Sequence, residues 1–254
     1  MGRRKKKVTK KIGKFKIKLS PFAWFIIILF CTYLGIVYKE EIDHLLTNIV
    51  KLTSPKMVSY DINDIPDYTD KDYVYINGNE PFFKEEEKTT REFETYSNLD
   101  LLGRCGVAYA NISIKTMPTE ERGSIGMVKP SGWKLAKYDI VDGKYLYNRC
   151  HLIGYQLAGE NANEKNLITC TRYMNTQPML EFENKVASYV SKTHNHVLYR
   201  VTPMYDGNNL VAKGVLMEGY SVEDKGKGIK FNVFVYNQQP GIVIDYKNGN
   251  SRLK

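Results

Sequence analysis

A long apolar run near the start of the chain sets the first limit on its architecture. Residues 21–38 carry no charged side chain over 18 positions, and residues 1–20 before them hold ten Lys and Arg and no acid. As a helix, the run would be about 27 Å long, close to the hydrocarbon thickness of a bilayer. We therefore expect a basic cytoplasmic tail at 1–20 and a transmembrane signal-anchor at 21–38, oriented by the positive-inside rule. A cleaved signal peptide is the alternative, although no small-x-small cleavage site follows the run.

The overall positive charge of the chain belongs mainly to this tail. The formal net charge is +9, from 37 Lys and Arg against 28 Asp and Glu. Without the first 20 residues the balance is 27 against 28, a net of −1. A basic composition therefore does not by itself indicate a nucleic-acid-binding protein. Residues 115–200 form the only sizeable block beyond the tail with a marked excess of cations, 12 against 8 acids.

The rest of the chain has the composition of a folded domain. Hydrophobic residues make up 43% of the sequence and aromatic residues 12%, which excludes a disordered or collagen-like chain. The polar segment 39–70 is expected to be a stalk or linker, and 71–254 an extracellular domain. Strands are expected at 73–76, 107–112, 145–153, 197–201, 210–216 and 231–236, and helices at 81–95 and 176–192. This pattern predicts an α+β fold with a mainly antiparallel sheet.

Four cysteines remain to be placed. Cys31 lies within the apolar run, and three others, Cys105, Cys150 and Cys170, lie in the expected domain. Three cysteines cannot all pair with one another, and none has the spacing typical of zinc ligands. We expect small, mostly buried thiols, with one disulfide as the alternative.

One constellation of side chains points to chemistry. Arg149 and His151 are two apart on an expected strand and would share a face. Two asparagines, Asn166 and Asn175, follow nine residues apart, and Glu183 lies eight further on, two turns along the expected helix that Asn175 would begin. His can accept a proton near neutral pH, Arg can bind a phosphate, and amide and carboxylate oxygens suit Mg²⁺. Taken singly, each residue also has an ordinary structural explanation as a buried His, a turn, a helix cap or a solvated helix residue.

Together these residues resemble a known family. The segment 148–151, Asn-Arg-Cys-His, resembles the D-R-G-H motif of the DNA/RNA non-specific endonucleases of the ββα-metal superfamily, and is most similar to the membrane-anchored and secreted streptococcal-type nucleases. The resemblance implies a ββα-metal core with His151 as the general base and Arg149 in contact with phosphate. It also implies Asn175 as a direct metal ligand, with Asn166 beside it, and Glu183 holding metal-bound water. The expected cofactor is Mg²⁺, or Mn²⁺.

Two motif positions depart from the family pattern. Asn148 replaces the Asp and supplies no negative charge, and Cys150 replaces the Gly. Neither change removes a catalytic group, so the expected reaction type stands while electrostatic help to the histidine is weaker. Arg172 and Lys185 are further candidates for substrate binding.

These residues predict a metal-dependent, largely sequence-non-specific endonuclease. Its substrate would be DNA, with RNA as an alternative, cleaved outside the cell membrane. The alternative function is a catalytically weak or inactive membrane-anchored protein that binds or takes up DNA. The third alternative is a structural zinc protein that uses Cys105, Cys150, His151 and Cys170.

Overall fold

The computed structural model describes residues 60–254, together with Ser20 and scattered positions between Phe25 and Leu45. The chain divides into two compact units, Met1–Leu45 and Leu46–Lys254. In the first unit most of the described positions are helical. The predicted basic tail and much of the predicted anchor lie outside the described residues. Among the positions that are described, no helix is both long and apolar enough to cross a membrane.

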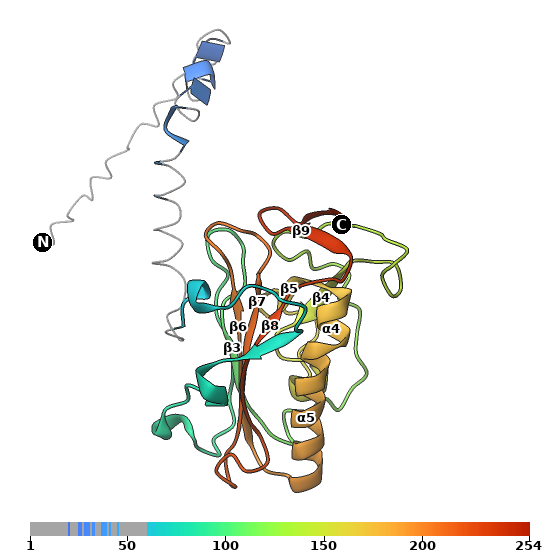
Figure 1. Cartoon of the computed structure of the whole chain (residues 1–254). Helices are drawn as coiled ribbons and strands as arrows, with labels where there is room; N and C mark the ends of the chain where they lie inside the picture. The colour runs from blue at the N-terminus through green and yellow to red at the C-terminus, as the bar shows by residue number, and fades with distance from the viewer. Residues whose placement is uncertain are drawn as a thin grey trace, which may run out of the picture. The chain divides into compact units, whose positions relative to one another are not determined.

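An antiparallel sheet forms the framework of the second unit (Figure 1). Six strands of the described part pair in the order β1-β8-β7-β6-β3-β2. Their bounds are β1 Tyr73–Tyr75, β2 Glu94–Tyr96, β3 Ala108–Ile112, β6 Val197–Met204, β7 Gly214–Ser221 and β8 Lys230–Tyr236. Two further antiparallel pairs join β4 (Tyr147–His151) to β5 (Leu167–Thr171) and β9 (Ile242–Asp245) to β10 (Asn250–Leu253). The predicted α+β class with a mainly antiparallel sheet is confirmed. One predicted strand, 210–216, begins later, at Gly214.

A long helix covers one face of this sheet (Figure 1). It is α5, Pro178–Thr193, and its buried residues Phe182, Val186 and Val190 recur at helical spacing. Phe182 packs against Phe231 of β8, with ring centroids 4.8 Å apart. Apolar burial of this stripe therefore fixes α5 on the sheet. Two shorter helices precede it, α3 (Tyr155–Ala158) and α4 (Arg172–Thr176), and 3₁₀ turns occupy Ile62–Asp64, Asn77–Asn79, Glu85–Glu87 and Glu164–Asn166.

The opposite face of the sheet is covered by the segment that precedes β3. Ile65 is buried against Phe234, and the Tyr236 hydroxyl donates a hydrogen bond to the Pro66 carbonyl at 2.7 Å. Part of the predicted linker, residues 60–70, is therefore packed on the domain.

The predicted helix at 81–95 is wrong. The segment holds only the short turn Glu85–Glu87 and then extends into β2. The Phe82 amide donates a hydrogen bond to the Glu218 carboxylate of β7 at 2.7 Å, which holds the backbone of this segment against the sheet. Phe83 and Phe93 both pack on Tyr109, which an extended segment allows and a helix with three consecutive glutamates does not favour.

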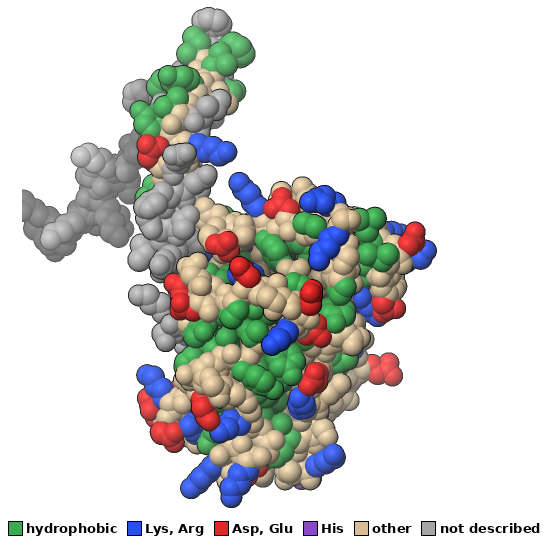
Figure 2. Space-filling view, viewed as in Figure 1, with side chains coloured by type: hydrophobic (Ala, Val, Ile, Leu, Met, Phe, Trp, Pro, Cys, Tyr) green, Lys and Arg blue, Asp and Glu red, His purple; other side chains and the backbone are tan. Residues whose placement is uncertain are grey.

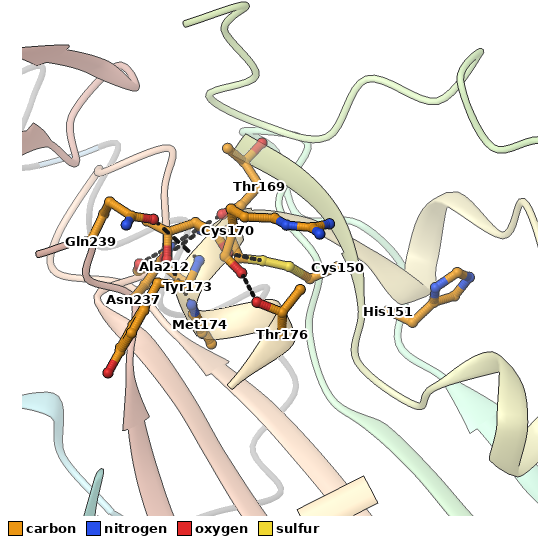
Figure 3. The surroundings of a disulfide bond; sticks show 12 residues. Cys150, His151, Thr169, Cys170, Tyr173, Met174, Thr176, Ala212, Asn237 and Gln239 are labelled. Atoms are coloured by element: carbon orange, nitrogen blue, oxygen red, sulfur yellow. Dashed lines mark hydrogen bonds between the residues drawn. A yellow bond between two sulfur atoms is a disulfide. The ribbon is translucent and has the colours of Figure 1, made fainter. Parts of the chain in front are cut away.

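The hairpin β4–β5 runs directly into α4 and builds the ββα unit. A disulfide joins Cys150 of β4 to Cys170 of β5, with Cα atoms 5.9 Å apart (Figure 3). The expectation of unpaired thiols is therefore wrong for these two cysteines, because antiparallel pairing brings them within disulfide reach. Cys105 is buried and unpaired, as expected. Its Sγ lies 3.1 Å from the Leu167 carbonyl oxygen, and burial raises the pKa of this thiol to about 12.

Candidate active site

His151 ends strand β4 and points away from the disulfide beside it (Figure 3). Its imidazole is buried, and Nε2 lies 2.7 Å from the backbone carbonyl oxygen of Asn161. A carbonyl only accepts, so Nε2 carries the hydrogen and Nδ1 carries the lone pair in the neutral ring. Burial lowers the pKa of His151, and the nearby Arg122 acts in the same direction. The ring is therefore held as a neutral base with a defined basic nitrogen.

Arg122 lies in a loop that the sequence allowed to flank the substrate groove, without deciding a role for it. Its Nη2 atom lies 3.3 Å from Nδ1 of His151. Its positive charge also opposes the raised pKa of Glu183, so the guanidinium is near enough to affect the pKa values of both the histidine and this carboxyl group. Arg122 lies outside regular secondary structure and belongs to no motif, so the sequence could not show that it contacts His151.

Arg149 lies on β4 with His151, as predicted, and its side chain hydrogen-bonds to the loop that precedes this strand. Its Nε and Nη2 atoms donate to the carbonyls of Val128 and Gly126, the latter at 2.8 Å. The guanidinium also lies over the Trp133 ring, 4.0 Å from its centroid. These contacts leave Nη1 for a phosphate, so contact with substrate stays a prediction. The same contacts give Arg149 a structural role as well, because they hold residues 126–133 beside the catalytic strand β4.

Asn166 is fully buried and acts as a brace. Its side-chain oxygen accepts from the Ile153 amide at 2.9 Å, and its side-chain nitrogen donates to the Ile153 carbonyl at 3.0 Å. Asn166 therefore joins the segment after His151 to the start of β5. Because its oxygen is already engaged and has no exposed surface, this geometry favours a supporting role over direct metal ligation.

Asn175 lies in α4, and not at the start of the long helix as predicted. The cap of α4 is Thr171, whose hydroxyl accepts from the Met174 amide at 3.0 Å. The chain then breaks at Gln177 (φ −116, ψ −90), and α5 begins at Pro178, which lacks an amide hydrogen. Asn175 is half-buried, and its side chain makes no hydrogen bond within the described part of the chain. Its amide oxygen is therefore available to a ligand.

Glu183, on α5, contacts the segment that follows His151. A Cβ atom added to Gly154 would lie 2.6 Å from its Oε2 and 3.0 Å from its Oε1, so the carboxylate rests directly on that glycine. Burial raises the pKa of Glu183 to about 8, and Gln156 and Arg122 oppose this shift. Gly154 is a second residue that the sequence did not mark, and its role becomes visible only in three dimensions.

The two remaining candidates for substrate binding are engaged elsewhere. Arg172 donates from Nε and Nη2 to the Asp142 carboxylate, at 3.1 and 2.9 Å. Lys185 pairs with Glu181 one turn earlier at 2.6 Å. Lys185 is also two residues from Glu183, about 200° around the helix, so it faces away from that carboxylate. The structure does not bring either cation to His151.

The donor set fits a hard cation that keeps most of its water. In the described ranges, no cluster of three or more His, Cys, Asp or Glu side chains is arranged to hold a metal ion. Among the described residues, the Asn175 amide oxygen has no hydrogen-bond partner and the half-buried Glu183 carboxyl group makes no ion pair. One neutral and one acidic oxygen suit Mg²⁺ or Mn²⁺ and lack the nitrogen and sulfur ligands that structural zinc prefers. Asn175 and Glu183 therefore have the ligand chemistry that suits such a cation, and metal binding by them stays a prediction.

Sequence comparison agrees with this geometry. The sequence model described as DNA/RNA non-specific endonuclease matches residues 84–223, more than half of the chain. A deoxyribonuclease from Streptococcus dysgalactiae subsp. equisimilis is 32% identical over 110 residues, which are 41% of this chain and 32% of that protein. The match therefore spans about a third of the length of this relative.

Two solved structures share the fold. NucA from Streptococcus agalactiae, crystallised with a magnesium ion bound, superposes with a TM-score of 0.63 at 24% identity over 71% of this chain and 86% of that chain. The Sda1 nuclease with a bound zinc ion superposes with a TM-score of 0.59 at 24% identity over 72% of this chain and 97% of that chain. With a family match over residues 84–223 and this fold, the chain belongs to the DNA/RNA non-specific endonuclease family.

Proposed function

We propose that the protein is a metal-dependent endonuclease that hydrolyses phosphodiester bonds of DNA with little sequence preference. RNA is a second candidate substrate. One observation carries the proposal: a neutral His151 with a defined basic Nδ1 atom lies 3.3 Å from the Arg122 guanidinium. A general base beside a phosphate-binding cation is what attack by water on a phosphodiester requires.

The reaction follows from what each side chain can do. His151 takes a proton from water at Nδ1, and the Asn161 carbonyl stabilises the resulting imidazolium through Nε2. In the structure without substrate, Arg122 donates toward that same Nδ1 atom. A substrate phosphate competes for Arg122, so binding releases the nitrogen that must accept the proton. Arg122 then stabilises the negative charge that develops on the phosphate oxygens.

The remaining residues position the substrate and the cation relative to His151. Arg149 offers Nη1 to a neighbouring phosphate while its other donors keep the loop in place. Asn175 and Glu183 would hold a Mg²⁺-type ion, the latter through metal-bound water. When bound, such an ion neutralises charge on the phosphate and on the 3′ leaving oxygen. Contacts to the backbone alone explain weak sequence preference.

The test is nicking of supercoiled plasmid by the full chain with Mg²⁺, with Mn²⁺ and with EDTA. Cleavage is expected with either ion and not with EDTA, and the His151→Ala variant should be at least about 100-fold slower. Restoration of a His151→Gly variant by added imidazole would support the base role specifically. Wild-type activity in His151→Ala would remove the assignment. Retention of labelled DNA without cleavage under any ion would favour the alternative, an inactive DNA-binding or uptake protein.

We also propose that the domain acts outside the cell membrane, tethered by residues 21–38. The support is the apolar run with ten cations before it. Protease added to intact cells should remove the nuclease domain and leave a membrane-bound N-terminal fragment. Recovery of all the nuclease in the cytoplasm would contradict this location.

A further inference from the structure

The loop gripped by Arg149 has an unusual charge. Residues 122–137 contain four cations, Arg122, Lys129, Lys134 and Lys137, and no acid. None of the four makes an ion pair within the part of the chain that the structure describes. On the face drawn in Figure 2, basic and acidic side chains are interspersed. The stretch 122–137 is therefore a local cationic surface, suited to a polyanion, and its first cation, Arg122, lies beside His151.

A large apolar side chain stands in this cationic surface. Met127 is 68% exposed, although single exposed apolar residues are common and need no explanation. What distinguishes Met127 is that its position is fixed. Arg149 donates to the carbonyls of both its neighbours, Gly126 and Val128, and so clamps the peptide on each side of it. The Arg149 guanidinium is held in turn over Trp133.

The two hydrogen bonds from Arg149, called the Arg149 clamp below, also determine where Met127 lies. Arg149 is two residues from His151 on the same face of β4, so the peptide that it grips borders the catalytic site. A side chain that only filled space on the surface would not require two charge-assisted hydrogen bonds from a residue of the site. A nucleic acid strand whose phosphates meet Arg122 and Arg149 would present its bases within reach of this border.

We propose that Met127 contacts substrate by packing against the bases of a nucleic acid strand held at the site. This inference rests on the proposed function. It assigns to Met127 an apolar contact with the faces of the bases, without hydrogen bonds to them. Thioether side chains are polarisable and pack well against aromatic rings, which every base provides. Such a contact adds affinity for polymeric substrate without adding sequence preference.

The experiment measures binding in a His151→Ala background, so that cleavage does not interfere. Fluorescence anisotropy would compare a labelled single-stranded oligonucleotide with one of equal length in which abasic spacers replace all bases. Met127→Ala should weaken binding of the normal strand about tenfold, the loss typical of one apolar side chain removed from an interface. It should leave binding of the abasic strand unchanged. Leu135→Ala is the matched control, because Leu135 is 75% exposed in the same loop but lies outside the clamp.

Each alternative outcome has a distinct meaning. Equal losses on both strands would show that Met127 acts through loop structure, and no loss on either would show that it does not touch substrate; both overturn the inference. A second readout is salt dependence, since Lys129→Ala should flatten the slope of log Kd against log salt while Met127→Ala leaves it unchanged. If the wild-type chain cleaves neither DNA nor RNA, the proposed function fails, while a difference between the two strands would still support base contact by Met127.

Discussion

The Nε2 atom of His151 lies 2.7 Å from the backbone carbonyl oxygen of Asn161, and this contact determines which ring nitrogen is basic. The Asn161 side chain reaches in the other direction, with Nδ2 3.4 Å from the Ser124 carbonyl. A Cβ atom on Gly123 would lie 2.7 Å from the same Nδ2, so the loop that carries Arg122 passes close over Asn161. Asn161 therefore links the orientation of the base to the position of its cationic neighbour.

The lowered pKa of His151 predicts the pH profile. Burial disfavours the imidazolium, so the folded pKa is below 6.5, and the base stays neutral down to that value. The step in log kcat/KM that belongs to His151 should therefore lie below pH 6.5, whereas protonation of Glu183, whose pKa burial raises to about 8, should lower activity at higher pH. In a Glu183→Gln variant only the His151 step should remain, and a step above 6.5 there would contradict the burial argument, provided the domain is still folded by circular dichroism at that pH.

Replacement of Arg122 should affect catalysis more than replacement of an exposed cation at the far end of α5. We expect Arg122→Ala to lower kcat by about 100-fold or more, because a charge-stabilising donor is lost at the phosphate. The acid limb should also move to higher pH, since a neighbouring positive charge no longer opposes protonation of His151. Lys192→Ala, on the last turn of α5, is the control. Equal kinetics of the Arg122→Ala and wild-type enzymes would show that the 3.3 Å contact has no catalytic meaning.

Gly154→Ala tests how Glu183 is seated. The added methyl group would lie 2.6 Å from Oε2, so the carboxylate must move. Displacing a group that orients metal-bound water typically costs about 10–100-fold in metal affinity. The Mg²⁺ concentration for half-maximal activity should rise by this factor, and saturating Mg²⁺ should restore part of the rate. A lowered melting temperature with an unchanged Mg²⁺ requirement would instead indicate a purely structural glycine.

The sequence predicted the parts of the site that depend on local order. Arg149 and His151 share a strand because side chains alternate at a period of two, and the amphipathic stripe of α5 follows from apolar residues at helical spacing. The break at Gln177 shows the limit of this reasoning. Periodicity ran the helix back to Thr176, whereas Pro178 begins a new helix and puts Asn175 in the preceding one.

Contacts between segments that are distant in the sequence could not be predicted from local sequence patterns. Arg122, Gly154 and Asn161 acquire their roles only when β4, the loop before it and α5 come together. The disulfide could not be derived either, since three cysteines in the domain allow several pairings and only the register of β4 and β5 selects one. The helix prediction for 81–95 was wrong for a related reason. The charged residues of this segment have helical propensity, whereas its phenylalanines pack against the sheet.

The disulfide predicts a definite thiol count. In denaturant without reductant, the full chain should show two reactive thiols, Cys31 and Cys105, and four after reduction. In the native protein Cys105 should resist alkylation, because burial raises its pKa to about 12. The bond joins positions 20 residues apart, so Cys150→Ser with Cys170→Ser should lower the free energy of unfolding by about 3 kcal/mol. Four thiols in the unreduced protein would contradict the pairing.

The two asparagines of the motif should fail in different ways. Asn166→Ala leaves the buried amide and carbonyl of Ile153 without partners, and each costs about 1–3 kcal/mol, so the variant should melt at a clearly lower temperature. Asn175→Ala removes a half-buried side chain that makes no hydrogen bond in the described structure, so stability should hardly change while the Mg²⁺ requirement rises. Thermal melts and Mg²⁺ titrations of both variants separate these effects, with Asn250→Ala, at an exposed position of β10, as control. If Asn175→Ala instead lost stability and kept its Mg²⁺ requirement, its amide would be a structural group, and the cation would need a different ligand.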